Sequence, residues 1–281
     1  MRELGAGAVR VGPGALFNQL ESIVNFESTV LIAIPSFIIR LIAFAKENKV
    51  DLNLTKVKSI VCIGEPIREA DFSFNELGLQ ITSQWNVRLH STYASTEMGA
   101  AFTECSEGKG GHLNPDLLHA EVVDDKGKQV GEGELGEVII TTLGVEGMPL
   151  LRYRTGDLCH VYYNKCLCGN AAMRLGPVIG RKQQMIKYKG TTLFPTAIFN
   201  VLAVEKINLY QVQVTKNEFG NDEVTLLLPE ELNEDRLIQS LRTVFKSRLR
   251  VMPNLQFIEK AKLAAVINTE NKRKPVKIVF K

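Results

Sequence analysis

Short apolar segments alternate with an amphipathic helix near the start of the chain, and this pattern constrains the fold more than any other feature. The apolar segments have the length of strands and occupy residues 30–34, 59–63 and 87–93. Ser36 is placed to cap a helix that runs to about Lys49 with one apolar face. Because strands that alternate with helices form parallel sheets, the pattern predicts an α/β fold, a parallel sheet with flanking helices. Residues 30–34 are expected to be buried in it.

Two sharp turns follow strands of this predicted sheet. They are Gly64-Glu65-Pro66 and Tyr93-Ala94-Ser95-Thr96-Glu97. Ligands of parallel sheets gather at the carboxyl ends of the strands, so both turns are candidate binding loops. An aromatic ring such as that of Tyr93 can lie on a purine, and a carboxylate such as Glu97 is a suitable ligand for Mg²⁺. Taken alone, however, the second turn is more typical of an ordinary polar turn.

The middle and the end of the chain predict two further parts. Residues 119–124 and 133–143 are expected to be strands of a small β-subdomain packed beside the first sheet. Beyond this region the pattern changes to that of a compact α+β domain. We therefore expect a large domain over residues 1–181 and a small mobile domain over residues 182–281, in which Asn233 caps a long amphipathic helix.

The balance of charge excludes some classes of partner. The 34 basic and 31 acidic residues give a net charge of +3, which offers no argument for a nucleic acid or a membrane surface. No apolar stretch is long enough to cross a bilayer, and the chain does not open with the pattern of a secretion signal. Five cysteines without such a signal favour free thiols or metal ligands over disulfides, so we expect a cytoplasmic protein.

The stretch from Pro149 to Asp157 carries the clearest chemical signal. It reads Pro-Leu-Leu-Arg-Tyr-Arg-Thr-Gly-Asp, and Arg181 follows about two dozen residues later. The glycine permits a tight turn at the end of a strand, and the aspartate can accept hydrogen bonds from both hydroxyls of a ribose. Arg181 adds a planar donor that stays charged. Thr-Gly-Asp alone is a weak signal that also occurs in ordinary turns, whereas the whole stretch is much more specific.

Together, the Tyr93–Glu97 and Pro149–Asp157 stretches resemble the adenylate-forming superfamily of acyl-CoA synthetases. The Leu-Arg-Tyr-Arg-Thr-Gly-Asp sequence is most similar to that of the phenylacetate-CoA ligase branch. The resemblance implies an acid–CoA ligase that uses ATP to convert an aryl carboxylate to an acyl-adenylate and then transfers the acyl group to coenzyme A. It also implies ATP or AMP, Mg²⁺ and coenzyme A as cofactors, and a partial adenylate-forming enzyme fold.

The resemblance assigns the nucleotide site to both turns and to the Thr-Gly-Asp motif. Asp157 and Arg181 would hold the ribose, and Tyr93 would lie against the adenine. Thr96 would donate to a phosphate oxygen, and Glu97 would be a ligand of Mg²⁺. The remaining residues of the implied site are Gly64, Glu65, Pro66, Ser95 and Ala94, the last of which stands where the family usually has glycine.

The resemblance assigns part of the catalysis and a hinge motion to the small domain. Lys274, in the basic stretch near the end of the sequence, aligns with the family's catalytic lysine, and Lys272 is the runner-up. The loop of Lys189 and Gly190 would approach coenzyme A after the domain pivots near Gln183. The family usually has aspartate or lysine at this pivot, so the glutamine is a departure. A basic run is otherwise typical of a solvated surface.

The resemblance covers nearly all 281 residues but only the later part of the family's length. The family's Ser/Thr/Gly-rich phosphate loop lies upstream of the strands found here, and the sequence does not contain it. We therefore expect either a fragment of a longer enzyme or a natural short form with impaired adenylation. The alternatives to an acid–CoA ligase are an acyl-protein synthetase of the same superfamily and a non-catalytic nucleotide-binding fragment. A homodimer is compatible with either.

Three cysteines and one histidine form a second candidate site, apart from the nucleotide motifs. Cys105 and His112 flank a glycine-rich turn, and Cys166 and Cys168 are separated by one residue. Three thiolates and one imidazole match the ligand set of a closed structural zinc site. Free thiols with a surface histidine are the alternative, and one ligand could instead be supplied by His119, Cys159 or His160.

Overall fold

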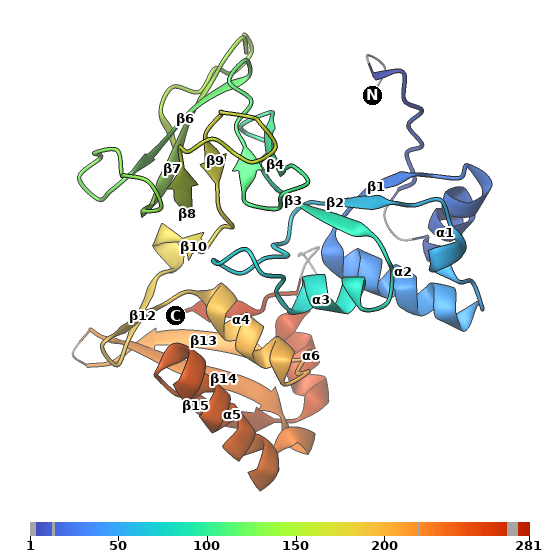
Figure 1. The fold of residues 1–281 in the computed structure, drawn as a ribbon. Coiled ribbons are helices and arrows are strands. Elements are labelled where there is room, and N and C mark those ends of the chain that lie inside the picture. Colours follow the sequence, from blue (N-terminus) through green and yellow to red (C-terminus); the bar gives the residue numbers. More distant parts are fainter. Residues whose placement is uncertain (1–3, 13–14, 219, 269–274) are drawn as a thin grey trace. The chain divides into compact units, whose positions relative to one another are not determined.

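The computed structural model describes residues 4–12, 15–218, 220–268 and 275–281. The chain divides into two compact units, Met1–Val178 and Ile179–Lys281 (Figure 1). The predicted catalytic residue Lys274 lies outside the described residues. Among the residues that are described, no helix has both the length and the apolar character that a membrane span requires.

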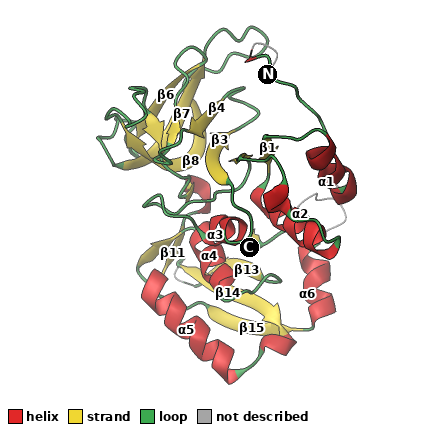
Figure 2. Ribbon diagram, turned by 45° about the vertical axis from the view of Figure 1, so that its right-hand side comes forward, coloured by secondary structure: helices red, strands yellow, loops and turns green. Residues whose placement is uncertain are grey.

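Parallel strands and three helices form the first part of the first unit. Its elements are α1 (Leu16–Asn25), β1 (Val30–Ala33), α2 (Pro35–Glu47), β2 (Ser59–Cys62), α3 (Glu76–Thr82) and β3 (Arg88–Ala94). Strand β1 pairs with β2, and β2 with β3, both in parallel. The helices lie together beside these strands (Figure 2) and share one hydrophobic core with them. The predicted parallel sheet with flanking helices is therefore confirmed.

Alternate side chains of the strands build this core. Ile60 and Cys62 of β2 are fully buried, together with Ile38 and Leu41 of α2. Burial raises the pKa of the Cys62 thiol to about 12, so this cysteine stays protonated in the core. The alternate side chains on one side of the strand therefore pack against the apolar face of the helix in one layer.

Two local expectations for this region are wrong. Strand β1 is first in the strand order, and its Val30 and Ile32 side chains are 49% and 56% exposed rather than buried. Helix α2 begins at Pro35, and Ser36 is not its cap, because the N-cap residue is Ile34. Proline starts a helix well, since the N–H that it lacks would have no partner within the helix.

The other strands of the first unit continue the sheet from β3 in antiparallel pairs. They are β4 (Ala101–Glu104), β5 (Gly111–His112), β6 (Leu118–Val123), β7 (Leu135–Thr142), β8 (Tyr153–Tyr162) and β9 (Arg174–Leu175). The order from β3 is β4, β5, β9, β8, β7 and β6. Strand β3 pairs with β2 through residues 88–91 and with β4 through residues 92–94. The predicted β-subdomain is therefore joined to the first sheet through β3 rather than packed beside it.

The second unit has an α+β architecture with its own core. Its elements are β10 (Gly180–Arg181), β11 (Ile186–Tyr188), β12 (Thr191–Leu193), α4 (Pro195–Val204), β13 (Gln211–Lys216), β14 (Asp222–Pro229), α5 (Asp235–Leu249), β15 (Asn254–Ile258), α6 (Lys260–Ile267) and β16 (Ile278–Phe280). Strands β15, β14, β13 and β16 form one sheet, and β11 and β12 a hairpin. Helix α5 begins later than predicted, because Glu234 rather than Asn233 is the N-cap residue.

Candidate functional site

A hydrogen bond joins the two predicted nucleotide motifs in the first unit. The Tyr93 hydroxyl donates to Asp157 Oδ2 at 2.9 Å, although 64 residues separate them in the chain. Tyr93 lies near the end of β3, where its ring packs on Phe102 of β4, and Asp157 lies in β8 with 8% exposure. Burial raises the pKa of the Tyr93 hydroxyl, and the nearby Asp157 charge adds to the increase. The hydroxyl therefore stays protonated and donates to the carboxylate.

The Thr155-Gly156-Asp157 motif lies within β8 at a bulge, not in a turn at the end of a strand as predicted. The register between β7 and β8 shifts at this point, and Gly156 has a φ of +75°. The Thr155 hydroxyl donates to the Val138 carbonyl at 2.8 Å and accepts a hydrogen bond from the Asp157 backbone at 3.1 Å. Since bulges redirect side chains and glycine tolerates positive φ, the motif fixes the direction of the aspartate.

The turn after β3 presents the predicted phosphate-side residues. Ser95 Oγ accepts a hydrogen bond from the backbone of the same turn at 3.3 Å, while Thr96 and Glu97 are exposed. Ala94 is still in β3 and pairs with Ala101. The backbone there is extended and accepts a side chain, although the family usually has glycine at this position.

The Glu65 carboxylate is directed to the start of α2. Its two oxygens accept hydrogen bonds from the backbone N and the hydroxyl of Ser36, each at 2.9 Å. An acidic group at a helix N-terminus is favourable. On the other side of the turn, the Pro66 carbonyl accepts a hydrogen bond from Asn75 Nδ2 at 2.9 Å, and Gly64 supplies a φ of +75°. The Gly64–Pro66 turn therefore has a fixed shape.

The predicted site residues of the second unit lie where that unit begins. Arg181 ends β10, and Gln183 lies in a short 3₁₀ helix that follows it. Lys189 and Gly190 form the turn between β11 and β12, with φ of +48° and +78°. The Lys189 ammonium donates to the Met252 carbonyl at 3.5 Å.

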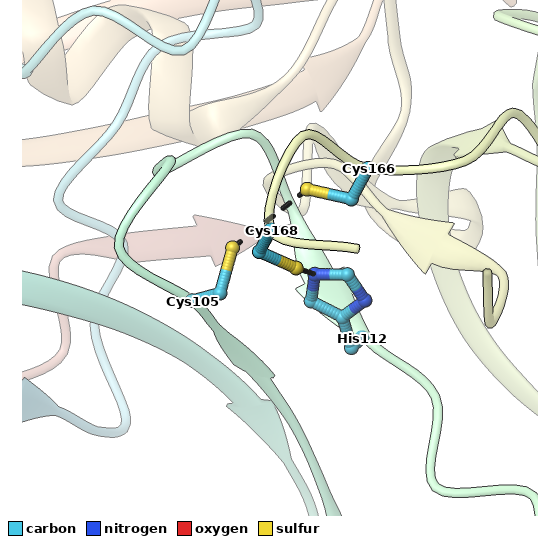
Figure 3. A group of neighbouring side chains, drawn as sticks. All are labelled: Cys105, His112, Cys166 and Cys168. Atoms are coloured by element: carbon cyan, nitrogen blue, oxygen red, sulfur yellow. Dashed lines mark hydrogen bonds between the residues drawn. The ribbon is translucent and has the colours of Figure 1, made fainter. Parts of the chain in front are cut away.

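The four predicted zinc ligands converge on one point in the first unit (Figure 3). Cys105 follows β4 and His112 belongs to β5, whereas Cys166 and Cys168 lie in the loop between β8 and β9. One ligand atom of each side chain lies within 4.8 Å of every other. The Sγ atoms of Cys105 and Cys166 are 3.8 Å apart, and Cys168 Sγ lies 3.6 Å from His112 Nε2.

These distances fit a tetrahedral zinc ion. Zn–S bonds of about 2.3 Å and Zn–N bonds of about 2.0 Å place two sulfurs about 3.8 Å apart and a sulfur and a nitrogen about 3.5 Å apart. The separation of 3.8 Å between Cys105 Sγ and Cys166 Sγ and that of 3.6 Å between Cys168 Sγ and His112 Nε2 agree with this geometry. The antiparallel pairing of β4 with β5 and of β5 with β9 is what brings the two ligand loops together.

A buried arginine suits the charge that such a cluster would carry. Arg174 pairs with His112 across β5 and β9, is 5% exposed, and donates to the backbone carbonyls of Lys109 and Asn164. Zn²⁺ with three thiolates has a net charge of −1, which the guanidinium would offset. Burial and then the Arg174 charge lower the pKa of His112, which favours the neutral imidazole that binds metals.

Among the residues that the structure describes, the three alternative ligands do not belong to this cluster. Cys159 is fully buried in the core of the β-subdomain, and burial raises the pKa of its thiol. His160 Nδ1 lies 2.9 Å from the Gly133 carbonyl, and His119 is exposed in β6. The arrangement therefore favours Cys105, His112, Cys166 and Cys168 as the ligand set.

Sequence reasoning missed a buried ion pair beside this cluster. Arg68 Nε lies 2.8 and 2.9 Å from the two carboxylate oxygens of Glu104, and the side chains are 11% and 2% exposed. The partners are 36 residues apart. The one signal in the sequence was the position of Glu104 directly before Cys105, and it does not reveal the arginine.

Comparison with known proteins adds sequence relatives. A family model described as AMP-binding enzyme matches residues 4–147, just over half of the chain. The phenylacetate-coenzyme A ligase of Thermus thermophilus is 32% identical over 229 residues, which span 79% of this chain and 50% of that ligase. The phenylacetate-coenzyme A ligase of Pseudomonas putida is 27% identical over 223 residues, which span 76% and 48%. The chain thus spans about half the length of the curated relatives it matches.

Comparison with solved structures identifies proteins of similar fold. A 2-hydroxyisobutyryl-CoA ligase in the postadenylation state, in complex with R3-HIB-AMP, has a TM-score of 0.71 at 20% identity, covering 97% of this chain and 58% of that one. The O-succinylbenzoate coenzyme A synthetase of Bacillus subtilis, in complex with ATP and magnesium ion, has a TM-score of 0.63 at 16% identity, covering 87% and 50%. These similarities confirm the predicted fold class.

Proposed function

Because the chain belongs to the AMP-binding enzyme family, we propose that the protein containing it is an acid–CoA ligase that activates a carboxylate with ATP. The proposed substrate is an aryl carboxylate of the phenylacetate kind, since the matched curated relatives are phenylacetate-coenzyme A ligases. The observation that carries the proposal is the hydrogen bond between Tyr93 and Asp157, which joins the two nucleotide motifs. The proposed location is the cytoplasm, a compartment that suits five cysteines without a disulfide.

The proposed reaction has two steps. A carboxylate oxygen of the acid attacks the α-phosphorus of ATP, the bond to pyrophosphate breaks, and an acyl-adenylate forms. The thiolate of coenzyme A then attacks the acyl carbon, AMP leaves, and the thioester forms. In both steps the protein contributes by positioning and charge neutralisation more than by acid–base catalysis.

The first unit would bind the nucleotide. Asp157 would accept hydrogen bonds from the ribose hydroxyls, while the Tyr93 hydroxyl holds this carboxylate in place and the ring lies against the adenine. Thr96 would donate to a phosphate oxygen, and the exposed Glu97 would be a ligand of Mg²⁺. Mg²⁺, when bound, would neutralise charge on the phosphates.

The second unit would serve the two steps in turn. Arg181 would add a charged donor for the nucleotide, and Lys274 would act in the adenylation step. The turn of Lys189 and Gly190 would approach coenzyme A in the thioester step, after a pivot near Gln183. Such alternation of a small domain is a common way to assemble two arrangements from one site.

Separate assays of the two half-reactions test the proposed function. In the protein that contains this sequence, Lys274→Ala should abolish the release of pyrophosphate that depends on the aryl acid. It should largely spare thioester formation from a supplied acyl-adenylate. Lys272→Ala, at the runner-up position, is the matched comparison and should leave both half-reactions near the wild-type rate. Equal loss of both half-reactions in the folded Lys274 variant, or no adenylation of any aryl acid by the wild type, would contradict the proposal.

We also propose that the cluster of three cysteines and one histidine binds a structural zinc ion. The supporting observations are the convergence of four ligand atoms within 4.8 Å and two separations, of 3.8 and 3.6 Å, that match a tetrahedral ion. All four positions of a tetrahedral ion would be filled by the protein, which is typical of a structural site. Elemental analysis should find about one zinc per chain. A wild type that holds no metal and takes up neither zinc nor cobalt would show that these residues are plain thiols.

A further inference from the structure

Arg68 has one well-defined position in the first unit. Besides the bond to both oxygens of Glu104, its Nη1 donates to the Phe72 carbonyl at 2.8 Å. Its guanidinium also lies over the Phe74 ring, 4.5 Å from the centroid. A planar fork held by a carboxylate, a carbonyl and a ring has little freedom, so its neighbours are held with it.

On one side, this arginine contacts the loop that carries a zinc ligand. Glu104 directly precedes Cys105, and its Oε2 also accepts a hydrogen bond from the Ser91 backbone of β3 at 2.9 Å. In the same loop, a Cβ added at Gly108 would collide with the Arg68 guanidinium. The loop after β4 therefore packs directly on the arginine as well as on its carboxylate partner.

On the other side, Arg68 follows the Gly64–Pro66 turn, which the family resemblance assigns to the nucleotide site. It lies two residues after Pro66, and the intervening Ile67 is fully buried. The Pro66 carbonyl is held by Asn75, whose backbone N also donates to the Ile67 carbonyl at 3.0 Å. So short and well-anchored a segment leaves the Gly64–Pro66 turn little freedom to move independently of Arg68.

We infer that Arg68 is a positioning residue that makes nucleotide binding depend on the zinc cluster. The inference rests on the proposed function, because it takes the Gly64–Pro66 turn as part of the nucleotide site. With zinc bound, Cys105 is fixed, so the loop holds Glu104 and Arg68, and these hold the turn. Without zinc the loop loses its link to Cys166 and Cys168, and Arg68 loses a fixed partner. Zinc thus strengthens AMP binding without contacting AMP.

Calorimetry of AMP binding to the 281-residue chain tests this dependence. We expect zinc-loaded wild type to bind AMP at least about fivefold more tightly than protein stripped of zinc by a chelator. The key variant is Arg68→Met with Glu104→Gln, which removes the ion pair without leaving one charge buried alone. It should bind zinc in wild-type amount and give the wild-type absorption spectrum with cobalt, but its AMP affinity should be the same with and without zinc.

Two further variants separate the possible failures. Ile42→Val, a change in the core of α2, should lower the melting temperature and leave the zinc effect on AMP affinity intact. Two outcomes would overturn the role of Arg68: equal AMP affinity of zinc-loaded and zinc-free wild type, or a zinc effect that persists in the double variant. If Asp157→Ala still weakens AMP binding in these cases, the proposed function stands. Absence of AMP binding to loaded wild type, or binding unaffected by Asp157→Ala, would overturn the proposed function and this inference with it.

Discussion

The cluster of three cysteines and one histidine and the nucleotide motifs lie in the same unit, but the cluster is the more fully assembled of the two. The cluster brings four ligand atoms within 4.8 Å of one another. On the nucleotide side, one hydrogen bond anchors Tyr93 and Asp157, while Thr96 and Glu97 lie on an exposed turn. A metal site is complete when its donor atoms converge on one point. A nucleotide has several groups, and a different loop must contact each of them. We therefore expect zinc to act mainly on the stability of the fold, and Asp157 to act mainly on ligand binding.

The largest expected effect is that of removing two zinc ligands. Cys166→Ser with Cys168→Ser should abolish zinc binding and lower the melting temperature of the first unit by roughly 10 °C. A ligand present at 1,000 times its Kd stabilises a fold by about 4 kcal/mol, and each kcal/mol shifts the melting temperature by about 2–4 °C in a domain of this size. Scanning calorimetry and elemental analysis on the same samples measure both quantities.

Leu167→Ser is the matched control for this loop. Leu167 lies between the two cysteines and is 90% exposed, so its replacement changes the same loop without removing a ligand. Zinc content and melting temperature should stay at the wild-type values. Zinc retained by the double cysteine variant, or an unchanged melting temperature, would show that Cys166 and Cys168 do not hold a structural zinc ion.

The convergence of Cys105, His112, Cys166 and Cys168 and the nucleotide motifs could be predicted because each depends on residue types that have few other uses. Cysteines close together in a chain of this composition indicate a metal site, and the sequence around Asp157 indicates a nucleotide site. The alternation of strands and helices likewise predicted the parallel pairing of β1, β2 and β3. These signals lie in short stretches of sequence, where local spacing carries most of the information.

The failures concern contacts between distant stretches. The bulge that directs Asp157 depends on the register of β7 against β8, which spacing within β8 does not reveal. At the start of α2, the hydrogen bond from the Ser36 backbone is accepted by Glu65, which lies 29 residues later in the chain. The pairing of Arg68 with Glu104 is equally remote. Side chains that stabilise a site from across the fold therefore remain invisible in the sequence pattern.

A second variant sharpens the comparison on the nucleotide side. Tyr93→Phe keeps the ring for adenine but removes the donor to Asp157. The carboxylate then loses its fixed orientation, and we expect AMP affinity to fall roughly fivefold, about 1 kcal/mol. Calorimetry with zinc-loaded protein measures this change. Loss of zinc in the same variant would show that Tyr93 also supports the zinc cluster, a role that its contacts do not predict.

The smallest expected effect lies in the second unit and should involve neither site of the first. Asp222 is 7% exposed, accepts a hydrogen bond from the Lys187 backbone at 2.6 Å and pairs with Lys216 at 2.5 Å. Burial raises the pKa of Asp222, but the hydrogen bonds of Lys216 and Lys187 outweigh it and hold this pKa below its ordinary range. The stabilisation is therefore present above the unfolded pKa, near 3.9, and is lost as the pH falls through the folded pKa.

Hydrogen exchange of the β13 and β14 amides measures this effect. At pH 7, Asp222→Asn should lower the free energy of local opening by about 0.5 kcal/mol relative to wild type, because the exposed Lys216 is screened by solvent. The difference should shrink as the pH falls below about 4. A difference that stays constant with pH would mean that the charge of Asp222 contributes nothing, and a change in zinc content would mean that the sites are coupled across the whole chain.

The most direct test of the account is AMP binding to zinc-loaded wild type and Asp157→Ala, measured by calorimetry. Asp157 is held by Tyr93 at 2.9 Å and is the proposed acceptor for two ribose hydroxyls. Each hydrogen bond to a charged group contributes about 1.5–3 kcal/mol, so the account predicts that AMP affinity falls at least about tenfold while zinc content stays at the wild-type value. A folded Asp157→Ala protein that binds AMP with unchanged affinity would contradict it.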